Sequence, residues 1–271
     1  MIEGLNVKCQ VGPVDVYRSP LIELTYKRRA VLTRCVVEIP DPKGEIRGQL
    51  AKDQPISIQF DYRGRGLKHS FEGFVDKIDQ PDHDGPNIDA LVVRGVGKEK
   101  SLLDTKVKEC FRKESTLAVA KRLMAQTGLP LGTVDIPDEI LPHQIFSKVT
   151  VARALKQIEH ILTRQYGHDM SEHAVWLGEA GLMWSPDKEP GDTYVVATFE
   201  NLIDHVPPVK PGAMGAIMSS LLPGLKDGME IRIDDKRRGV GSTERAEEVI
   251  HTLREYSNLT TVMYGKKTGW C

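Results

Sequence analysis

The chain has 271 residues, of which 40% are hydrophobic and 28% charged, with 37 basic and 38 acidic side chains. The composition is ordinary for a globular protein, and the balanced charge excludes a bulk electrostatic attraction to nucleic acid or to a membrane surface. No apolar run approaches the roughly 18 residues of a membrane span, and the N-terminal segment MIEGLNVKC lacks the apolar core of a signal peptide. We therefore expect a protein made in the cytoplasm, with no membrane span and no specific nucleic-acid binding.

The first part of the chain is predicted to be almost entirely β-structure. Apolar and polar side chains alternate in four runs, at residues 5–11, 31–39, 56–62 and 88–92. Gly73, inside a further strand-like run, indicates a bulge or a sharp bend of the sheet. Short strands separated by regular turns are typical of a closed or nearly closed barrel. We predict a first β-barrel domain over residues 1–98.

The sequence period changes beyond this point. Ser115 or Thr116 is the candidate N-cap of one helix and Thr150 that of a second, in which apolar residues recur at i, i+3, i+4 and i+7. The two helices are expected over residues 116–126 and 151–162. Two short strand-like runs then flank a Gly-Glu-Ala-Gly turn. We predict an α/β domain over residues 99–188.

β-structure resumes after a linker rich in proline, glycine and aspartate. The clearest strand has Met229, Ile231 and Ile233 alternating with charged residues. Residues 246–253 fit strand and helix patterns less cleanly, and we predict a strand there. The region 189–271 is therefore predicted as a second β-barrel domain. The expected fold is α+β and mainly β, with two small antiparallel barrels flanking an α/β insert.

Potential metal ligands are densest in one short segment after the second helix. They are His168, Asp169, Glu172 and His173. The histidines are five residues apart, which does not place them on one face of a helix, and no standard motif supplies a further ligand. The widely spaced cysteines support neither a zinc site nor a disulfide framework; they are Cys9, Cys35, Cys110 and Cys271. We predict no metal and no cofactor.

Candidates for catalysis are few. Asp234 and Asp235 are adjacent carboxylates, but the three basic residues after them favour charge pairing on a surface loop. His251 lies in a strand-like run, where a histidine hydrogen-bonded at a strand edge is commoner than a catalytic one. The sequence contains no G-x-S-x-G, no Walker-type phosphate loop and no dinucleotide fingerprint. We predict no catalytic residue and a protein that is not an enzyme.

Tryptophans could in principle form a carbohydrate platform; they are Trp176, Trp184 and Trp270. The first two alternate with apolar neighbours, which favours packing in the core of the α/β domain. Two alternatives stay open. One is an enzyme that degrades cell-wall polysaccharide with acids near these tryptophans, namely Glu172, Glu179 or Asp187. The other is a carbohydrate- or receptor-binding module that uses exposed loops.

Four segments that follow one another along nearly the whole chain carry a family resemblance. They are the paired runs 56–60 and 71–75, Ser101–Asp104 with the helix 116–126, residues 143–146 with the helix 151–162, and residues 222–229 with 246–253. In this order they resemble the baseplate hub proteins of contractile phage tails. That family is also known as late control D proteins and is related to the N-terminal part of type VI secretion spike proteins.

The resemblance implies a structural protein of the virion tail baseplate, assembled in the host cytoplasm. Members are homotrimers in which each subunit contributes two similar barrels, so that a pseudo-sixfold ring joins a sixfold tail tube to a threefold central spike. The implied partners are the tail tube protein, the central spike protein, other baseplate wedge proteins and a tape-measure protein. The sequence ends at Cys271 without a needle, lysozyme-like or peptidoglycan-binding segment, so any spike or hydrolase is expected as a separate polypeptide.

Overall fold

The computed structural model describes residues 4–79, 90–178, 180–186, 193–210 and 212–265. The chain divides into two compact units. We call one the sheet unit, which comprises Met1–Lys27, Leu32–Lys98 and Gly191–Lys267. We call the other the insert unit, which comprises Arg28–Val31, Glu99–Pro190 and Thr268–Cys271. The fold is mainly β, as predicted, and the three domain boundaries given above stay a prediction.

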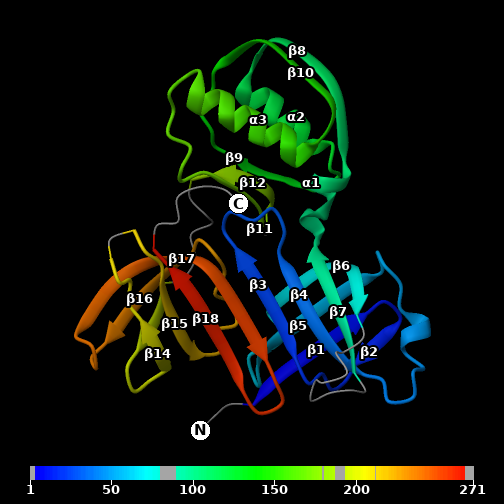
Figure 1. Cartoon of the computed structure of the whole chain (residues 1–271), viewed down its shortest axis with the longest axis vertical. Coiled ribbons are helices and arrows are strands. Elements are labelled where there is room, and N and C mark those ends of the chain that lie inside the picture. The colour runs from blue at the N-terminus through cyan, green and yellow to red at the C-terminus, as the bar shows by residue number, and fades with distance from the viewer. Residues whose placement is uncertain (1–3, 80–89, 179, 187–192, 211, 266–271) are drawn as a thin grey trace. The chain divides into compact units, whose positions relative to one another are not determined.

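The sheet unit contains one large, mostly antiparallel sheet (Figure 1). A short 3-10 helix, η1 (Arg47–Gln49), precedes its fifth strand. Its strands are β1 (Leu5–Val11), β2 (Val14–Val16), β3 (Ile22–Lys27), β4 (Arg34–Pro40), β5 (Pro55–Tyr62), β6 (His69–Asp79), β7 (Ala90–Gly97), β13 (Tyr194–Ala197), β14 (Leu202–Val206), β15 (Gly215–Ser220), β16 (Glu230–Asp235), β17 (Val240–Leu253) and β18 (Asn258–Tyr264).

Neighbouring strands follow the order β14-β15-β18-β17-β3-β4-β7-β6-β5-β1-β2, with β16 paired to β17 and β13 paired in parallel to β16. The pairing of β17 with β3 joins residues of the predicted first and third domains into this single sheet. β17 does so because it is long and bends at a bulge between Ala246 and Glu248. Its first half pairs with β16, and its second half lies between β18 and β3. The predicted strand at residues 246–253 is confirmed.

One apolar core stabilises the sheet unit, and it draws on both halves of the sheet. In β3 the buried side chains alternate with half-buried ones, as the period of a strand requires. Cys9 and Cys35 are buried in this core, as expected for small hydrophobes. Burial raises the pKa of each thiol to about 12, so neither is a nucleophile at neutral pH.

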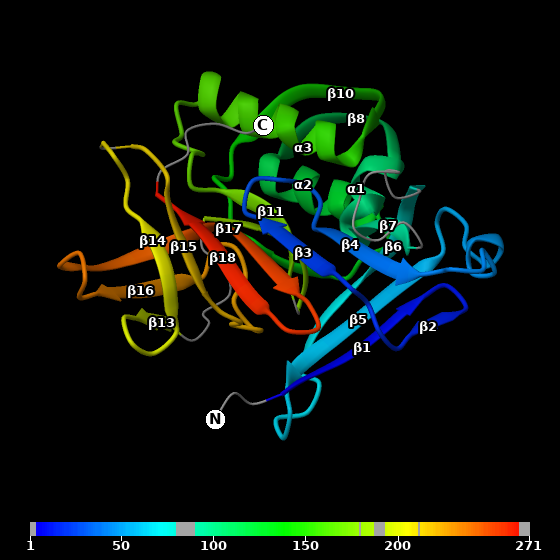
Figure 2. The ribbon, with the colours of Figure 1, turned by 60° about the horizontal axis from the view of Figure 1, so that its bottom comes forward.

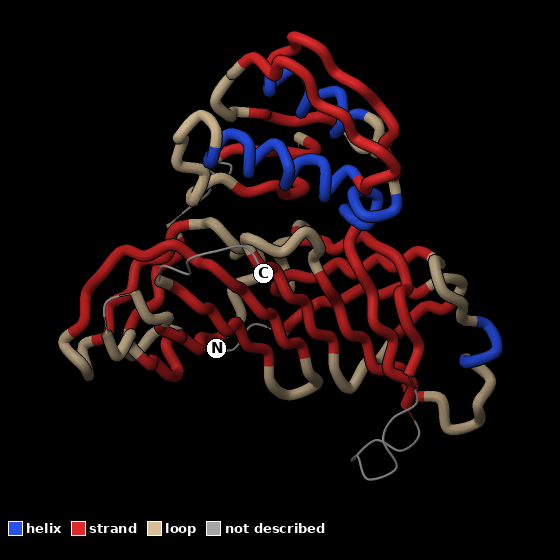
Figure 3. Tube along the Cα trace, turned by 45° about the horizontal axis from the view of Figure 1, so that its top comes forward, coloured by secondary structure: helices blue, strands red, loops and turns tan. Residues whose placement is uncertain are grey.

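The insert unit is built from a short helical start, two longer helices and two small sheets. Its elements are η2 (Lys98–Lys100), α1 (Ser101–Asp104), β8 (Lys106–Ser115), α2 (Thr116–Ala125), β9 (Leu131–Val134), β10 (Ile140–Thr150), α3 (Val151–Arg164), β11 (Ala174–Gly178) and β12 (Gly181–Ser185). α2 and α3 lie between the β8–β10 ribbon and the three-stranded sheet β11-β12-β9 (Figure 3). No described helix has both the length and the apolar character needed to cross a membrane.

Both predicted helices are confirmed, together with their caps. The Ser115 hydroxyl accepts a hydrogen bond from Ala118 N, and the Thr150 hydroxyl accepts one from Arg153 N. The buried side chains of α3 recur at the spacing of one helix face. On the opposite side of the core, Phe111 of β8 meets Phe146 of β10 edge to face, with ring centroids 5.8 Å apart.

Candidate functional site

The potential metal ligands of residues 168–173 lie in one loop region, but their side chains have separate partners and do not surround a common point. His168 Nε2 lies 2.8 Å from a carboxylate oxygen of Glu139, and the Asp169 carboxylate accepts a hydrogen bond from the Ser171 N–H. Glu172 faces the Arg28 guanidinium instead, with 3.7 Å between the charged atoms. Among the residues that the structure describes, no three histidine, cysteine, aspartate or glutamate side chains gather as a metal site.

Arg28 explains why Glu172 is a poor candidate for acid catalysis. The Arg28 side chain is 1% exposed and donates hydrogen bonds to the carbonyl oxygens of Glu172 and Pro186. A buried guanidinium must satisfy its donors within the protein, so this arginine fixes the loop and holds the Glu172 carboxylate in an ion pair. Glu179 and Asp187, the other acids of the polysaccharide-hydrolase hypothesis, lie outside the described residues.

Trp184 is 1% exposed and packs in the core of the insert unit, as predicted, whereas Trp176 is half-buried. Trp270 lies outside the described residues. A carbohydrate platform needs an exposed ring face on which the sugar stacks, and Trp184 has none. The tryptophans that the structure describes therefore give the carbohydrate hypotheses little support.

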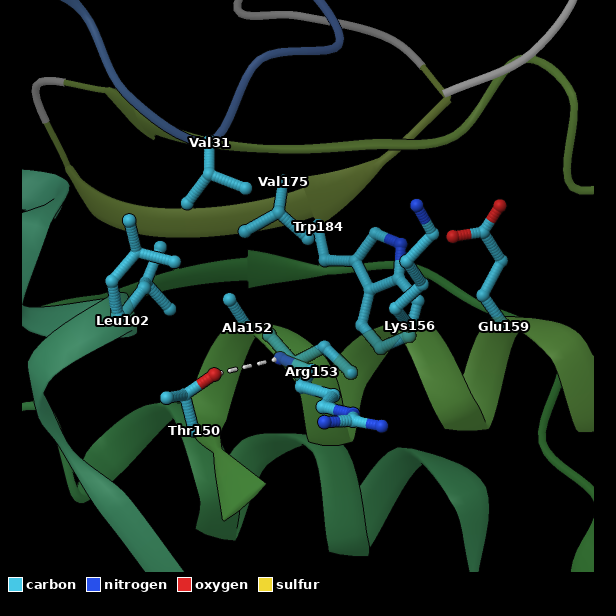
Figure 4. Close-up of a pocket in the computed structure, with 11 residues that line it drawn as sticks. Val31, Leu102, Thr150, Ala152, Arg153, Lys156, Glu159, Val175 and Trp184 are labelled. Atoms are coloured by element: carbon cyan, nitrogen blue, oxygen red, sulfur yellow. Dashed lines mark hydrogen bonds between the residues drawn. The ribbon is translucent and has the colours of Figure 1, made fainter. Parts of the chain in front are cut away.

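A pocket of about 210 Å³ opens in the insert unit (Figure 4). Its walls are largely apolar and include Val31, Leu102, Val175 and Trp184, and charged side chains of α3 such as Lys156 complete the lining. This volume has room for several water molecules or for a small apolar group. Its described lining contains one carboxylate and no serine, cysteine or histidine. The pocket is suited to holding an apolar group rather than to hydrolysis.

The third region of the chain holds a buried polar network that the sequence did not reveal. His205 Nδ1 lies 2.8 Å from an Asp235 carboxylate oxygen, and His205 Nε2 lies 2.7 Å from the Tyr264 hydroxyl. The Thr198 hydroxyl donates to the other Asp235 oxygen at 3.2 Å. These side chains connect β14, β16 and β18, three strands that are not consecutive in the sheet. Asp235 ends β16 and lies 3.6 Å from the Arg238 guanidinium, as the predicted charge pairing requires, but its side chain is buried, so the predicted surface location is wrong.

Electrostatics favour a structural role for this network. Burial by itself would raise the pKa of Asp235, but hydrogen bonds from His205 and Thr198 outweigh it, and the pKa lies below its ordinary value. Burial raises the pKa of Tyr264. His205, Asp235 and Tyr264 are each 2% exposed, so a substrate cannot reach the histidine. The three groups satisfy one another inside the sheet unit.

We expect replacement of Asp235 by alanine to lower the urea midpoint of unfolding clearly. The change leaves His205 Nδ1 and the Thr198 hydroxyl buried without their partner. Asp234, the half-buried neighbour on the other face of β16, is the matched control, and its replacement by alanine is expected to have a much smaller effect. Circular dichroism measures urea unfolding of both variants. Equal unfolding midpoints for the two would contradict the structural role of the network.

His251 is fully buried in the middle of the sheet rather than at a strand edge as predicted. Its strand pairs on both sides, with β18 and with β3. His251 Nε2 donates to the Leu225 carbonyl oxygen at 2.8 Å, and Nδ1 lies 3.0 Å from the Thr260 hydroxyl. Tyr26 and Phe60 pack against its ring, with centroids 5.8 and 5.7 Å away. The side chain is thus a neutral, hydrogen-bonded part of the core.

The pKa of His251 is lowered to about 4, chiefly by burial and in smaller part by Coulombic interactions with His69 and Lys226, while the hydrogen bond to the Leu225 carbonyl opposes part of this shift. Above pH 6.5 the histidine is neutral in both the folded and the unfolded chain. Between pH 6.5 and about 4 only the unfolded chain binds the proton, so the free energy of unfolding should fall by about 3 kcal/mol over this range. Urea unfolding at a series of pH values measures this, and His251→Gln should remove that part of the fall. An unchanged pH dependence in the variant would show that another group is responsible.

The sheet ends at an open, apolar edge. β14 pairs with β15 on one side only within the described part of the chain (Figure 2). Ile203 and Val206 of this strand are 46% and 53% exposed, and Phe199 and Val209, just outside it, are more exposed still. Unpaired backbone groups beside exposed apolar side chains are a template for association with another strand. At the other end of the path lies β2, followed by the exposed Tyr17.

The chain is similar to known proteins in fold but not in sequence. No protein-family model and no curated protein matches the sequence. Among solved structures, a tail protein from Neisseria meningitidis MC58 has a TM-score of 0.63 and 13% identity, with 98% of both chains covered. The 43 kDa tail protein of prophage MuSo2 from Shewanella oneidensis has a TM-score of 0.63 and 10% identity over 97% of both chains.

A third similar structure is the E. coli c3393 protein, described as a component of the type VI secretion system that resembles the T4 bacteriophage tail proteins gp27 and gp5. Its TM-score is 0.66 at 8% identity, with 98% of this chain and 77% of that chain covered. At such low identities the likeness shows a shared fold over almost the whole length of the chain. The chain therefore has the fold of phage tail proteins and of a type VI secretion component.

Proposed function

We propose that this chain is a structural subunit of the tail baseplate of a phage, or of a related injection particle. The observation that carries the proposal is the end-to-end fold likeness to a tail protein, which covers 98% of both chains. The open apolar edge at β14 supports a role in assembly. The densest groups of titratable side chains among the described residues are buried or ion-paired, which favours a role without catalysis.

The finer form of the proposal is a hub of the late control D type. Three copies would form a ring, in which each chain supplies two barrel-like halves that are joined through the pairing of β17 with β3. The two different ends of the sheet, β14 and β2, favour this arrangement, because a head-to-tail contact between unlike edges closes into a ring when the rotation per subunit fits. Six similar halves would then give pseudo-sixfold symmetry.

Such a ring would lie in the virion tail, between a sixfold tail tube and a threefold central spike. The tube protein and the spike protein are the proposed partners, with wedge proteins at the periphery and a tape-measure protein as a further contact. Strand edges and apolar rims buried between subunits would supply the free energy of assembly. No cofactor, metal or nucleic-acid sequence takes part in this function.

Electron microscopy of the purified chain tests the proposal. We expect closed rings whose class averages show three strong repeats and six weaker ones. Open filaments would contradict the closed symmetry, and particles the size of a single chain at high concentration would contradict the ring itself. Incubation with peptidoglycan provides a separate check, in which release of soluble fragments would favour the hydrolase hypothesis instead.

A further inference from the structure

The β8–β10 ribbon of the insert unit has one face directed toward the helices and one directed away from them. Its inward side chains include Phe111 and Phe146, which are 1% exposed. The outward side chains of β8 are exposed and alternate with these; they are Lys106, Lys108, Cys110 and Arg112. Their register partners on β10 are Thr150, Ser147, Ile145 and His143. We call this outward surface the ribbon face.

Positive charge is concentrated on the ribbon and is not neutralised there. Its five basic residues are Lys106, Lys108, Arg112, Lys113 and Lys148, and all are exposed. None of them forms an ion pair or a side-chain hydrogen bond with a described residue. The ribbon's acids differ: Glu109 is half-buried and paired with Arg122 of α2, and Glu114 is half-buried at the end of β8. The outward charge is therefore basic.

Two of these basic residues have a backbone conformation that favours glycine. Lys113 has a φ of 53° and Lys148 a φ of 54°, both in the left-handed region that disfavours side chains. Lys148 is the extra residue of a bulge between Ser147 and Val149, and bulges re-aim side chains at functional surfaces. A ribbon that faced only solvent would gain no stability from a lysine at either strained position, so we attribute these two charges to function.

The ribbon face also has an apolar centre, which indicates the kind of partner. Ile145 is 58% exposed and lies opposite Cys110 in the register, between Lys108 and Arg112 along the ribbon. Protein interfaces combine an apolar centre with a polar rim. Nucleic-acid surfaces are more polar, and single-strand binders add aromatic rings for base stacking, whereas the exposed large side chain here is aliphatic.

We propose that the ribbon face binds an acidic, extended segment of another protein. Alternate residues of an extended chain lie about 7 Å apart on one side, which matches the spacing of Lys106 and Lys108. Carboxylates at alternate positions would pair with the ribbon's cations while one apolar side chain covers Ile145. This surface belongs to the insert unit and includes no residue of the sheet edges, so the inference does not depend on the ring.

The probe is a fluorescein-labelled peptide, Glu-Ser-Glu-Ser-Leu-Ser-Glu-Ser-Glu. Fluorescence anisotropy measures its binding to the full chain. We expect saturable binding that weakens as salt is added, because exposed charges are screened. The triple variant K106E/K108E/R112E should bind at least tenfold more weakly. The matched control, K8E/K43E/K68E, changes the net charge equally at exposed positions of the sheet unit and should bind within twofold of the natural chain.

A second variant separates binding from stability. K113G/K148G removes two cations and places glycine at both left-handed positions, so its thermal midpoint should be unchanged or higher while the peptide binds more weakly. Unchanged peptide affinity in this variant would contradict the proposal, as would equal weakening in K8E/K43E/K68E or the absence of saturable binding. Tighter binding of a 20-base-pair DNA duplex than of the peptide would overturn the assignment of a protein partner.

Discussion

Gly73→Ala is expected to destabilise the sheet unit by about 3 kcal/mol or more. A Cβ atom at Gly73 would lie 2.1 Å from the Val96 carbonyl oxygen and 2.9 Å from Phe71 Cζ. The first contact is with backbone, so no side-chain rotation relieves it, and β6 and β7 must separate where Gly73 pairs with Gly97. Guanidinium unfolding followed by far-ultraviolet circular dichroism measures the loss.

Gly241→Ala is the control for this substitution. Gly241 also lies within a strand, β17, but a Cβ there would meet nothing within 4 Å and its φ is ordinary. Alanine at such a site reduces the entropy of the unfolded chain, so the free energy of unfolding should change little or rise by about 0.4–1 kcal/mol. Similar losses for both variants would show that the close approach of β6 and β7 is not what Gly73 provides.

If the chain forms the proposed trimeric ring, the double variant I203K/V206K is expected to convert that ring into single chains. Both residues are exposed on the open strand β14, so lysine should not disturb the fold of the isolated chain. Charge on an edge strand is a known means of preventing edge-to-edge association. Analytical ultracentrifugation should show a loss of at least tenfold in the population of trimers.

Ile145→Lys, which adds one positive charge at a site outside the edge, is the control for the edge variant. Ile145 is similarly exposed but belongs to the β8–β10 ribbon, and its substitution should leave the proposed trimer intact. If both variants dissociate the assembly equally, general surface charge rather than the β14 edge decides association. A trimer that survives I203K/V206K would remove β14 from the interface.

The elements that the sequence predicted well carry a local signal. The two long helices combine apolar periodicity with a capping hydroxyl, and Thr150 was identified directly. β8 was missed because its inward positions include Glu109, which breaks the apolar alternation and is satisfied by Arg122 of α2 and by Gln126 at the end of that helix. That pairing depends on the packing of a helix against the ribbon, which no local pattern reports.

The buried network shows what a sequence pattern could have revealed. His205, Asp235 and Tyr264 are far apart in the sequence and meet only through strand pairing. Asp235, however, continues the inward face that starts with Ile231 and Ile233, so alternation alone places it in the core. The three basic residues after it favoured a surface loop instead. The pairing of β17 with β3, which joins the predicted first and third domains into one sheet, likewise could not be predicted without knowing the register of the strands.

Light scattering of the purified chain after size exclusion tests the central claim most directly. If the chain is a ring-forming tail subunit, its mass at high concentration should be three times the 30.2 kDa of one chain, and I203K/V206K should return it to one. A mass of 30.2 kDa for the natural chain at every concentration, alone and with a tail tube or spike protein added, would contradict the account.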